Sequence, residues 1–497
     1  MKPKDRMLIV SNRLPVALST EEGKLAGRPA SGGLVNALSP VLKNKGGVWA
    51  GWPGTLQEVS PSALSGILRR VSAESGYRLL PVNLTKEDLD SFYSGFSNSV
   101  LWPLFHDLQG RCDFNPSYWD GYMTANEKFS KVLLRHVKEG DFVWVNDYHL
   151  IPLGGMLRAR RPGLKASFFL HIPFPNVDIF MKMPQRKRIL SQLTHYSFVG
   201  FQTMRDRRNF LDCLKIFYPE MKASGRGNVV RVRKKDEVFL VGAVPISIDF
   251  RSFSALASSK SVISRSHEIR KEISADRYIL GVDRLDYSKG IPERLRGFQR
   301  FLQLHPEQRG RVSMMQVVVP SRESVGEYLD LKQEIELLIS RVNGEYSTTG
   351  WVPVHWRYGT VPREELAALY RGADMALVTS LKDGMNLVCK EYCACKTDAD
   401  GVLVLSEFAG AAIQLANGAL LVNPYDVDAV ASAIVEGLTM DEGERKRRMR
   451  GLRKSIARND VFRWVDDFLR ASVGKKLSEF PEEEASAMWP GLESDGE

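Results

Sequence analysis

The stretch YILGVDRLDYSKG, residues 278–290, places two cations directly after an apolar run. The run from Tyr278 to Gly281 predicts a buried strand that leads into a glycine-containing turn and then a helix. At such a turn in α/β proteins, backbone N–H groups and the positive end of the helix face an anionic ligand. Arg284 and Lys289 would add two full charges there. An isolated Arg/Lys pair is also common on solvated surfaces, so the other strand ends of the chain must be considered.

Apolar runs with polar ends recur along most of the 497 residues. Short β-branched runs alternate with amphipathic segments, and this alternation predicts parallel sheets covered by helices. The runs start near residues 8, 142, 166, 198 and 238 and, after a Ser-rich interval at 252–276, near residues 278, 312, 373, 402 and 419. We therefore expect an α/β protein of two doubly wound Rossmann-like domains, residues 1–250 and 251–460, facing across a cleft.

Composition and charge are those of an ordinary globular protein, with 43% hydrophobic residues. A net charge of +10, from 69 basic and 59 acidic residues, suits nucleic acid, a membrane surface or small anionic substrates. The basic clusters are dispersed among acids, and no nucleic-acid motif accompanies them. The longest apolar region, residues 401–422, contains Glu407, Gln414 and Asn417, so it is not a membrane span. We expect neither a nucleic-acid nor a membrane partner.

The cysteines and aspartates predict neither disulfides nor a metal site. Five cysteines without a CxxC pair indicate reduced thiols and hence a cytoplasmic protein. Asp-x-Asp tripeptides can hold a divalent ion against a diphosphate, but here each occurs in a polar turn or helix start where aspartate is favoured for capping. They are Asp88–Asp90, Asp398–Asp400 and Asp426–Asp428. We expect no metal and no cofactor.

The C-terminal region divides into a helix and a tail. Residues 461–473 carry Phe462, Trp464 and Phe468 at helical spacing, which predicts an amphipathic helix that needs a surface to dock on. The acidic segment 479–497 is expected to be disordered.

Polar residues directly follow several of the predicted strands. Because ligands of open parallel sheets bind outside the carboxyl ends of the strands, these residues are candidates for one binding region; they are Arg13, Asp147, His171, Arg284 and Arg322. Taken singly, Asp147 could be a helix N-cap and His171 a satisfied core histidine. After Arg13, Gly32 and Gly33 would open a helix and let the backbone approach a phosphate or sugar. A GxGxxG or Walker pattern is absent from the sequence, which disfavours nicotinamide and P-loop chemistry.

The stretch LKDGMNLV, residues 381–388, follows another predicted strand. Its Asp-Gly pair predicts a turn that feeds a helix carrying Glu391, and the Asp383 carboxylate with nearby amides suits sugar hydroxyls. Glu391 would lie two helical turns beyond Gly384, within reach of a second set of hydroxyls such as a ribose. The alternative is a β-turn followed by a capped helix.

These stretches and several others together resemble the trehalose-6-phosphate synthase family of retaining glycosyltransferases. The resemblance extends from about residue 7 to residue 470, with the motifs in order. They are SNRLPV, GGL, FYSGFSNSVLWPLFH, WDGY, NDYHLIPL, FFLHIPFP, GFQT, DRLDYSKG, DGMNLV and VLSEFAGAA.

The resemblance implies a GT-B fold of two Rossmann-like domains, with the acceptor in the N-terminal domain, the nucleotide sugar in the C-terminal domain and a helix near 460–475 that crosses back to the first. It implies transfer of glucose with retention from a nucleotide sugar, first of all UDP-glucose, to glucose 6-phosphate. The implied catalytic residues are Asp147, His171, Arg284 and Lys289. The implied acceptor residues are Arg13, Tyr93 and Arg322 for the phosphate, with Trp102 and Asp147 for the sugar. The implied donor residues are Gly32, Arg284, Lys289, Asp383, Met385, Asn386, Leu387 and Glu391.

Two features depart from the family pattern or vary within it. Ser247 replaces the usual glycine in the interdomain segment, which questions the local turn geometry, and the base-contacting region near Trp351–Trp356 is variable, so the base is less firmly implied than the sugar. Three rival functions stay open: a glucosylglycerol-phosphate synthase using glycerol 3-phosphate, a catalytically silent regulator that binds sugar phosphates, and a nucleic-acid binder. The sequence also leaves open whether the chain forms a homo-oligomer.

Overall fold

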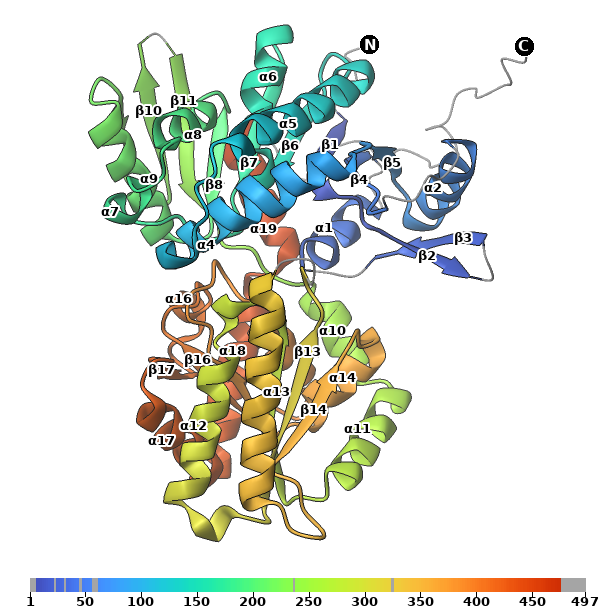
Figure 1. Ribbon diagram of the computed structural model, residues 1–497, viewed down its shortest axis with the longest axis vertical. Coiled ribbons are helices and arrows are strands. Elements are labelled where there is room, and N and C mark those ends of the chain that lie inside the picture. Colours follow the sequence, from blue (N-terminus) through green and yellow to red (C-terminus); the bar gives the residue numbers. More distant parts are fainter. Residues whose placement is uncertain are drawn as a thin grey trace. The chain divides into compact units, whose positions relative to one another are not determined.

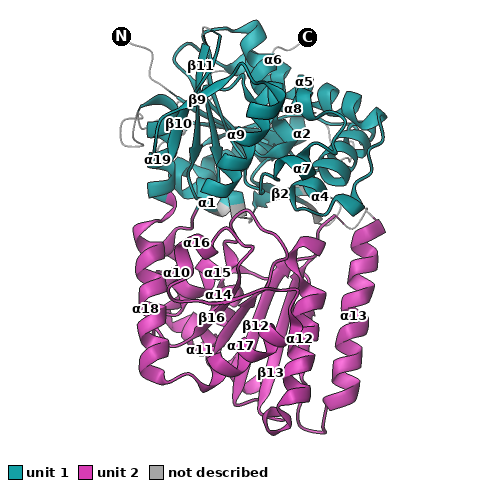
Figure 2. Ribbon diagram, turned by 90° about the vertical axis from the view of Figure 1, so that its left-hand side faces the viewer, with its two compact units in different colours: residues 1–246, 462–497 teal, residues 247–461 magenta. Residues whose placement is uncertain are grey.

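The computed structural model describes residues 6–21, 24–30, 33–43, 47–55, 61–235, 237–322 and 326–474. Gly32 and the acidic segment 479–497 lie outside the described residues. The chain divides into two compact units, Met1–Ile246 with Phe462–Glu497 and Ser247–Val461. Figure 2 colours the two units separately. Within the described part of the chain, no helix combines the length and apolarity needed to cross a membrane.

Unit 1 is built from strands alternating with helices. Its strands are β1 (Met7–Arg13), β2 (Val16–Glu21), β3 (Lys24–Pro29), β4 (Val48–Trp52), β5 (Arg78–Pro81), β6 (Phe142–Asn146), β7 (Lys165–Phe169), β8 (Phe198–Phe201), β9 (Lys222–Ser224), β10 (Val229–Lys234) and β11 (Glu237–Ala243). Its helices are α1 (Gly33–Lys43), α2 (Pro61–Ser75), α3 (Lys86–Asp88), η1 (Leu89–Leu101), α4 (Trp102–Phe105), η2 (Gln109–Arg111), α5 (Ser117–His136), η3 (Tyr148–Leu150), α6 (Leu153–Arg160), α7 (Val177–Phe180), α8 (Arg186–Leu193), α9 (Met204–Phe217) and most of α19 (Val461–Val473).

The main sheet of unit 1 has a doubly wound core. Among the described residues the strand order is β5-β4-β1-β6-β7-β8-β11-β10-β9. If the strands of this sheet alone are numbered along the chain, the first six in this order are 3-2-1-4-5-6, the order of dinucleotide-binding folds. All pairs from β5 to β11 are parallel, as predicted, whereas β10 pairs antiparallel with both β11 and β9. Continuous apolar runs do not mark this part of the sheet, because β10 alternates buried and exposed residues, the pattern of a strand that is covered on one face only. The direction of winding changes between β1 and β6, and this is where the fold places a ligand.

The C-terminal helix α19 packs on the sheet of unit 1. Phe468 stacks on Trp144 of β6 with ring centroids 3.9 Å apart, and Trp464 donates its indole N–H to the Val244 carbonyl at 3.1 Å. In Figure 1, α5 lies in front of this sheet and α19, in red, lies behind it. Two of the three aromatic residues expected on the docking side of α19, Trp464 and Phe468, are 2% exposed or less. The third, Phe462, is exposed and does not belong to that side.

Unit 2 begins with the Ser-rich interval, which is helical. Its helices are α10 (Phe250–Ala257), α11 (Lys260–Ile273), η4 (Tyr287–Lys289), α12 (Ile291–Leu304), η5 (Pro306–Gln308), α13 (Gly326–Tyr346), α14 (Arg363–Gly372), α15 (Val388–Cys395), α16 (Ala412–Leu415), α17 (Val427–Thr439) and α18 (Glu442–Arg458). Its strands are β12 (Arg277–Arg284), β13 (Val312–Val319), β14 (Val354–Tyr358), β15 (Met375–Val378), β16 (Val402–Ser406) and β17 (Leu420–Val422).

The sheet of unit 2 repeats the core topology of unit 1. In the described residues its order is β14-β13-β12-β15-β16-β17, again 3-2-1-4-5-6, and every pair is parallel. Residues 278–290 form most of the first strand, β12, and the turn that follows it. The winding changes direction between β12 and β15. Both units thus confirm the predicted doubly wound α/β class.

Ser247 does not disturb the backbone at the start of unit 2. The residue is fully buried and is not among the residues with a left-handed backbone, so glycine is not required there on conformational grounds. The serine therefore does not alter the local turn geometry of the backbone. Its hydroxyl is buried and has no hydrogen-bond partner among the described residues.

Candidate functional site

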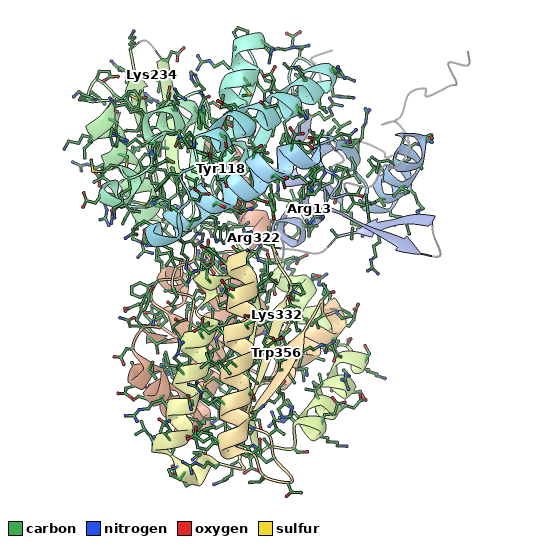
Figure 3. All side chains as sticks on the ribbon, in the orientation of Figure 1. Arg13, Tyr118, Lys234, Arg322, Lys332 and Trp356 are labelled. Atoms are coloured by element: carbon green, nitrogen blue, oxygen red, sulfur yellow. The ribbon has the colours of Figure 1, made fainter. Side chains whose placement is uncertain are left out.

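In unit 1 the polar strand ends gather at the switch between β1 and β6. Arg13 ends β1, and its guanidinium lies 5.2 Å over the ring of Trp52, which ends the neighbouring strand β4. Figure 3 labels Arg13 at this edge of the sheet. Gly54 leaves room for that guanidinium, because a Cβ at this position would lie only 2.1 Å from Arg13 Nη2. The arginine is exposed, so its charge is available to an anion at the end of β1.

Asp147 follows β6 in a backbone conformation that aspartate seldom adopts, with φ at 74°. It occupies the N-cap position of the short helix η3, but its carboxylate makes no capping hydrogen bond to that helix. Instead Oδ1 accepts the backbone N–H of His171 at 3.1 Å, which ties the ends of β6 and β7 together. Left-handed backbone outside glycine costs free energy and is concentrated at functional sites, which supports a ligand-directed role for this side chain.

His171 lies two residues beyond β7 as a neutral imidazole. Removal of the ring from water lowers its pKa to about 3, so the imidazole is neutral. Its one proton is assigned to Nε2, because that atom lies 3.0 Å from the acceptor Asn146 Oδ1. The edges of Phe169 and Trp464 pack against the ring, at 4.7 and 6.2 Å between centroids. The ring is thus oriented on three sides, while part of the residue is accessible to solvent.

Tyr93 and Trp102 reach the same region from the π-helix η1 and from α4. Tyr93 is parallel to His149, with ring centroids 5.8 Å apart and planes 9° apart. Trp102 is buried and lies 5.6 Å from Tyr148. Because Tyr148 and His149 directly follow Asp147, the structure brings Tyr93, Trp102 and Asp147 together. Sequence spacing alone could not do so, because more than 40 residues separate the first two from the third.

In unit 2 the switch between β12 and β15 is spanned by an ion pair. Lys289 Nζ lies 2.6 Å from Asp383 Oδ2, with side chains 11% and 13% exposed. The two loops are also joined through backbone, since Leu381 N–H donates to the Ser288 carbonyl at 2.8 Å. Gly290 allows this close approach: its φ is 62°, and a Cβ would lie 2.3 Å from the Thr379 carbonyl oxygen. Arg284 ends β12 nearby in sequence and is exposed.

The loop after β15 is longer than the sequence suggested. Helix α15 begins at Val388, so residues 381–387 form a loop instead of the start of a helix. Asp383 Oδ2 also accepts hydrogen bonds from Ser380 Oγ at 3.3 Å and Asn386 Nδ2 at 3.2 Å. Asn386 is left-handed, with φ at 74°, and the Met385 carbonyl accepts the Ala411 N–H at 2.8 Å. The loop is therefore held in one conformation, with Leu387 at the N-cap position of α15.

Glu391 lies in the first turn of α15 as a buried carboxyl group, 7% exposed. It accepts a hydrogen bond from the Tyr370 hydroxyl at 3.0 Å. Burial raises its pKa to about 7. The expected spacing of two helical turns from Gly384 is wrong, because the intervening residues are not helical.

Arg322 follows β13 with a left-handed backbone, φ 52°, and a side chain only 4% exposed. Its Nη1 donates to Asp286 Oδ2 at 3.2 Å and to the Tyr328 hydroxyl. Figure 3 labels Arg322 in unit 2. The arginine thus lies at the same sheet edge as Lys289 and Asp383, held by a carboxylate of the β12 turn.

The predicted base-contacting region, Trp351–Trp356, leads into the edge strand β14. Trp351 is buried, and Trp356 is partly exposed and stacks with Tyr358 at 6.0 Å between centroids. Lys332 of α13 lies 4.8 Å over the Tyr358 ring. Figure 3 labels Lys332 and Trp356 in this part of unit 2.

Arg294 supports the unit 2 site and was missed by motif reading. Its side chain on α12 is fully buried and contacts Asp283, Gln316, Thr379 and the Lys289 carbonyl. It therefore connects β12, β13, β15 and the turn at residues 285–290. The signal in the sequence is a charged residue on the apolar face of α12, three residues after Ile291 and four before Phe298.

The Asp-x-Asp tripeptides have other partners. Asp88 pairs with Lys128, Asp400 with Arg445 and Asp428 with Arg300, while Asp426 caps α17. Among the residues that the structure describes, no group of three or more His, Cys, Asp or Glu side chains could hold a metal ion.

Comparison with known proteins identifies the family. The profile of glycosyltransferase family 20 matches residues 5–472. Alpha,alpha-trehalose-phosphate synthase [UDP-forming] A of Dictyostelium discoideum is 40% identical over 94% of this chain, and the match spans 62% of that longer protein. The trehalose-6-phosphate synthase of Mycolicibacterium vanbaalenii is 41% identical over 94% of this chain and 96% of its own length.

Solved structures agree in fold over nearly the whole chain. An alpha,alpha-trehalose-phosphate synthase (UDP-forming) from Burkholderia xenovorans, in complex with glucose-6-phosphate, has a TM-score of 0.83 at 33% identity and covers 94% of this chain and 99% of its own. An E. coli structure bound with UDP-2-fluoro glucose has a TM-score of 0.81 at 35% identity and covers 94% and 98%. This chain belongs to glycosyltransferase family 20.

Proposed function

We propose that this protein transfers glucose, with retention of configuration, from UDP-glucose to glucose 6-phosphate, releasing UDP and α,α-trehalose 6-phosphate. Full-length relatives named trehalose-6-phosphate synthase, about 40% identical, support this activity. Solved structures of the same fold bound to glucose 6-phosphate and to UDP-2-fluoro glucose support the two substrates. The observation in this chain that carries the proposal is the Lys289–Asp383 pair at the β12/β15 switch, because a diphosphate and a sugar need a cation and a carboxylate side by side.

Unit 2 is proposed to bind the nucleotide sugar. Arg284 and Lys289 would hold the diphosphate, with Gly32 and His171 of unit 1 contacting the diphosphate and glucose. The Asp383 carboxylate and the backbone at Met385 and Asn386 would hold the glucose hydroxyls. Leu387 and Glu391 would contact the ribose and phosphates. The hydrogen bonds that fix residues 383–386 in one conformation support this assignment, since a preformed loop loses little conformational entropy on binding.

Unit 1 is proposed to bind the acceptor sugar. Arg13, Tyr93 and Arg322 would bind the phosphate of the acceptor, and Trp102 and Asp147 would contact the sugar ring. Support comes from the way Tyr93 and Trp102 pack on the two residues that follow Asp147. Hydrogen bonds to a charged group contribute about 1.5–3 kcal/mol each, so a phosphorylated acceptor would be strongly preferred to free glucose.

The proposed chemistry is a displacement on the face from which UDP departs, without a covalent sugar–enzyme intermediate. A retaining glycoside hydrolase would instead need two carboxylates about 5 Å apart beside the bond. Here Asp383 is engaged by Lys289, Ser380 and Asn386, and Asp147 accepts the His171 amide. The work of the protein is then to position both sugars and to stabilise the charge that grows on the departing diphosphate. Neutral His171 donates its Nε2–H to Asn146 Oδ1 and would help to orient the site.

Two fixed cations take the place of a metal ion in this proposal. Arg284 and Lys289 supply the positive charge that other sugar transferases obtain from a divalent ion on the diphosphate. We therefore expect initial rates in excess EDTA to equal those in buffer. A complete loss of activity that Mg²⁺ or Mn²⁺ restores would contradict this assignment. We also propose a cytoplasmic location, because Cys213, Cys389, Cys393 and Cys395 are free thiols, which suits a reducing compartment.

The direct test is release of nucleoside diphosphate from UDP-, GDP- and ADP-glucose, each with glucose 6-phosphate, with glycerol 3-phosphate, or with neither acceptor. We expect rapid UDP release only with UDP-glucose and glucose 6-phosphate together. Preference for glycerol 3-phosphate would indicate the glucosylglycerol-phosphate activity instead. Absence of release with all pairs, while glucose 6-phosphate still binds, would indicate a silent regulator.

A further inference from the structure

Asp286 lies inside the anion-binding turn, between Arg284 and Lys289, and the family resemblance assigns it no role. Its side chain is fully buried. Oδ1 accepts the Ser288 backbone N–H at 2.9 Å, and Oδ2 accepts Arg322 Nη1 at 3.2 Å. One carboxylate therefore contacts both the turn that carries Lys289 and an arginine that follows a different strand.

Fixing the turn does not by itself require this arrangement. An Asx-type bond to Ser288 uses one oxygen of the side chain, and an asparagine would serve as well. A buried ion pair is costly to desolvate, and an apolar replacement is often as stable. The pairing of Asp286 with Arg322, at 0% and 4% exposure, therefore calls for a reason beyond folding.

The position of Arg322 supplies that reason. Its backbone is left-handed, and the two hydrogen bonds to Asp286 and Tyr328 are both donated by Nη1. Tyr328 also lies under the guanidinium, with its ring centroid 5.5 Å from Cζ. When Nη1 is fixed by these two acceptors, the orientation of the whole planar guanidinium is set. This orientation matters because a guanidinium binds phosphate well only in its own plane.

We propose that Asp286 is a positioning residue that orients Arg322 toward the phosphate of the acceptor and keeps it in register with the turn that carries Arg284 and Lys289. Selectivity for a phosphorylated acceptor then depends on a residue that touches no substrate. The inference rests on the proposed function, because it takes Arg322 as a ligand of the acceptor phosphate. Tyr328 is the second support of the same guanidinium.

The test compares kcat/KM for glucose 6-phosphate with that for glucose in the full-length enzyme and its variants. Arg322→Ala should lower the ratio about ten- to a hundredfold. Asp286→Asn keeps an oxygen for Ser288 but loses the charge, and it should lower the ratio about tenfold or more. Tyr328→Phe keeps the ring and loses one neutral acceptor, so a reduction of about two- to tenfold is expected. In Asp286→Asn/Arg322→Ala the ratio should equal that of Arg322→Ala alone.

Asp283→Asn is the matched control. Asp283 is also buried and paired with an arginine, Arg294, three residues earlier in the same segment. Its loss should affect both acceptors alike and leave the ratio unchanged. The Kd of glucose 6-phosphate, measured by calorimetry, should rise in Asp286→Asn, while the Kd of UDP should stay within about twofold of wild type.

Each failure has its own signature. An unchanged ratio and an unchanged Kd for glucose 6-phosphate in both Asp286→Asn and Tyr328→Phe, with a large ratio in wild type, would overturn the positioning role. A further fall of the ratio when Asp286→Asn is added to Arg322→Ala would show that Asp286 does not act through Arg322. A wild-type ratio near one would instead contradict the proposed function, since no acceptor phosphate would then be recognised.

Discussion

Lys289 and Asp383 show how single residues create a site at a strand end. Each is largely removed from water, and each would be costly to bury alone. Together they form a 2.6 Å pair at the β12/β15 switch. In the proposed function, the diphosphate would share the ammonium and the sugar would share the carboxylate.

Removing either cation of the turn should slow catalysis more than it weakens acceptor binding. Arg284→Ala and Lys289→Ala each remove a charge that is proposed to stabilise the departing diphosphate. The activation barrier should rise by about 2–4 kcal/mol, so kcat should fall roughly 30- to 1,000-fold. Lys446→Ala, which breaks only a surface pair with Glu442, is the control and should be near wild type. Steady-state kinetics that show a raised acceptor KM at normal kcat would remove these residues from the role.

Glu391 should make the stability of unit 2 depend on pH. Burial raises its pKa from 4.5 to about 7, so between these pH values the folded state binds the proton more tightly than the unfolded state. Its contribution to the free energy of unfolding should therefore decrease as the pH rises through this window, by up to about 3 kcal/mol. Glu391→Gln should lose this dependence. In denaturant unfolding, the free energy of unfolding of the variant relative to wild type should therefore be higher at pH 8 than at pH 5. Parallel pH profiles of the two proteins would contradict the buried carboxyl.

At the scale of elements, the loop at residues 381–387 depends on contact between two backbone segments. The Gly410 N–H donates to the Asp383 carbonyl at 3.1 Å, and a Cβ at Gly410 would lie 1.9 Å from the Gly384 carbonyl oxygen. The loop that carries Asp383, Met385 and Asn386 is therefore shaped by the segment after β16. Motifs that are far apart in the sequence, DGMNLV and SEFAGAA, form one structural feature.

Gly410→Ala should displace this loop. Overpacking of this kind costs about 1–3 kcal/mol, and we expect a raised KM for the nucleotide sugar with little change in the KM for glucose 6-phosphate. Gly344→Ala in α13 is the matched control, because a Cβ there meets nothing within 4 Å and alanine favours a helix by about 0.5–1 kcal/mol. Equal donor KM values in the two variants would show that the loop does not depend on Gly410.

At the scale of the whole molecule, the chain ends by returning to its first unit. Helix α19 follows the last helix of unit 2, yet its aromatic side packs on β6, β7 and β8 through Trp464 and Phe468. Unit 1 therefore needs residues from both ends of the sequence, and the core that positions Asp147 and His171 includes the C-terminal helix.

Phe468→Ala should destabilise unit 1 by about 3–5 kcal/mol, the usual effect of emptying a buried phenylalanine site. Phe462→Ala, on the exposed side of the same helix, should change stability by less than about 0.5 kcal/mol. Thermal unfolding followed by intrinsic tryptophan fluorescence checks both. Similar losses in the two variants would mean that α19 is not docked through its aromatic side.

Sequence patterns predicted the parallel strands and the amphipathic α19 because burial imposes a strong period on apolar residues. The apolar runs did not include β10, because its buried residues alternate with exposed, charged ones. The predicted α15 extended too far toward Gly384, because no local signal distinguishes a fixed loop from a helix start. The supporting pairs Arg294–Asp283 and Arg322–Asp286 could not be predicted, since which charges become buried together depends on the packing of distant segments. The family resemblance proposes which residues form the site, and the structure shows which contacts fix their side chains.

The most direct test of the account is the structure of the reaction product. UDP-glucose and ¹³C-labelled glucose 6-phosphate should give equal amounts of UDP and one labelled disaccharide phosphate, and NMR should show α configuration at both anomeric carbons. Free glucose in place of the disaccharide, a β-linked product, or an unchanged labelled acceptor would contradict the claim that this chain is a retaining glucosyltransferase acting on glucose 6-phosphate.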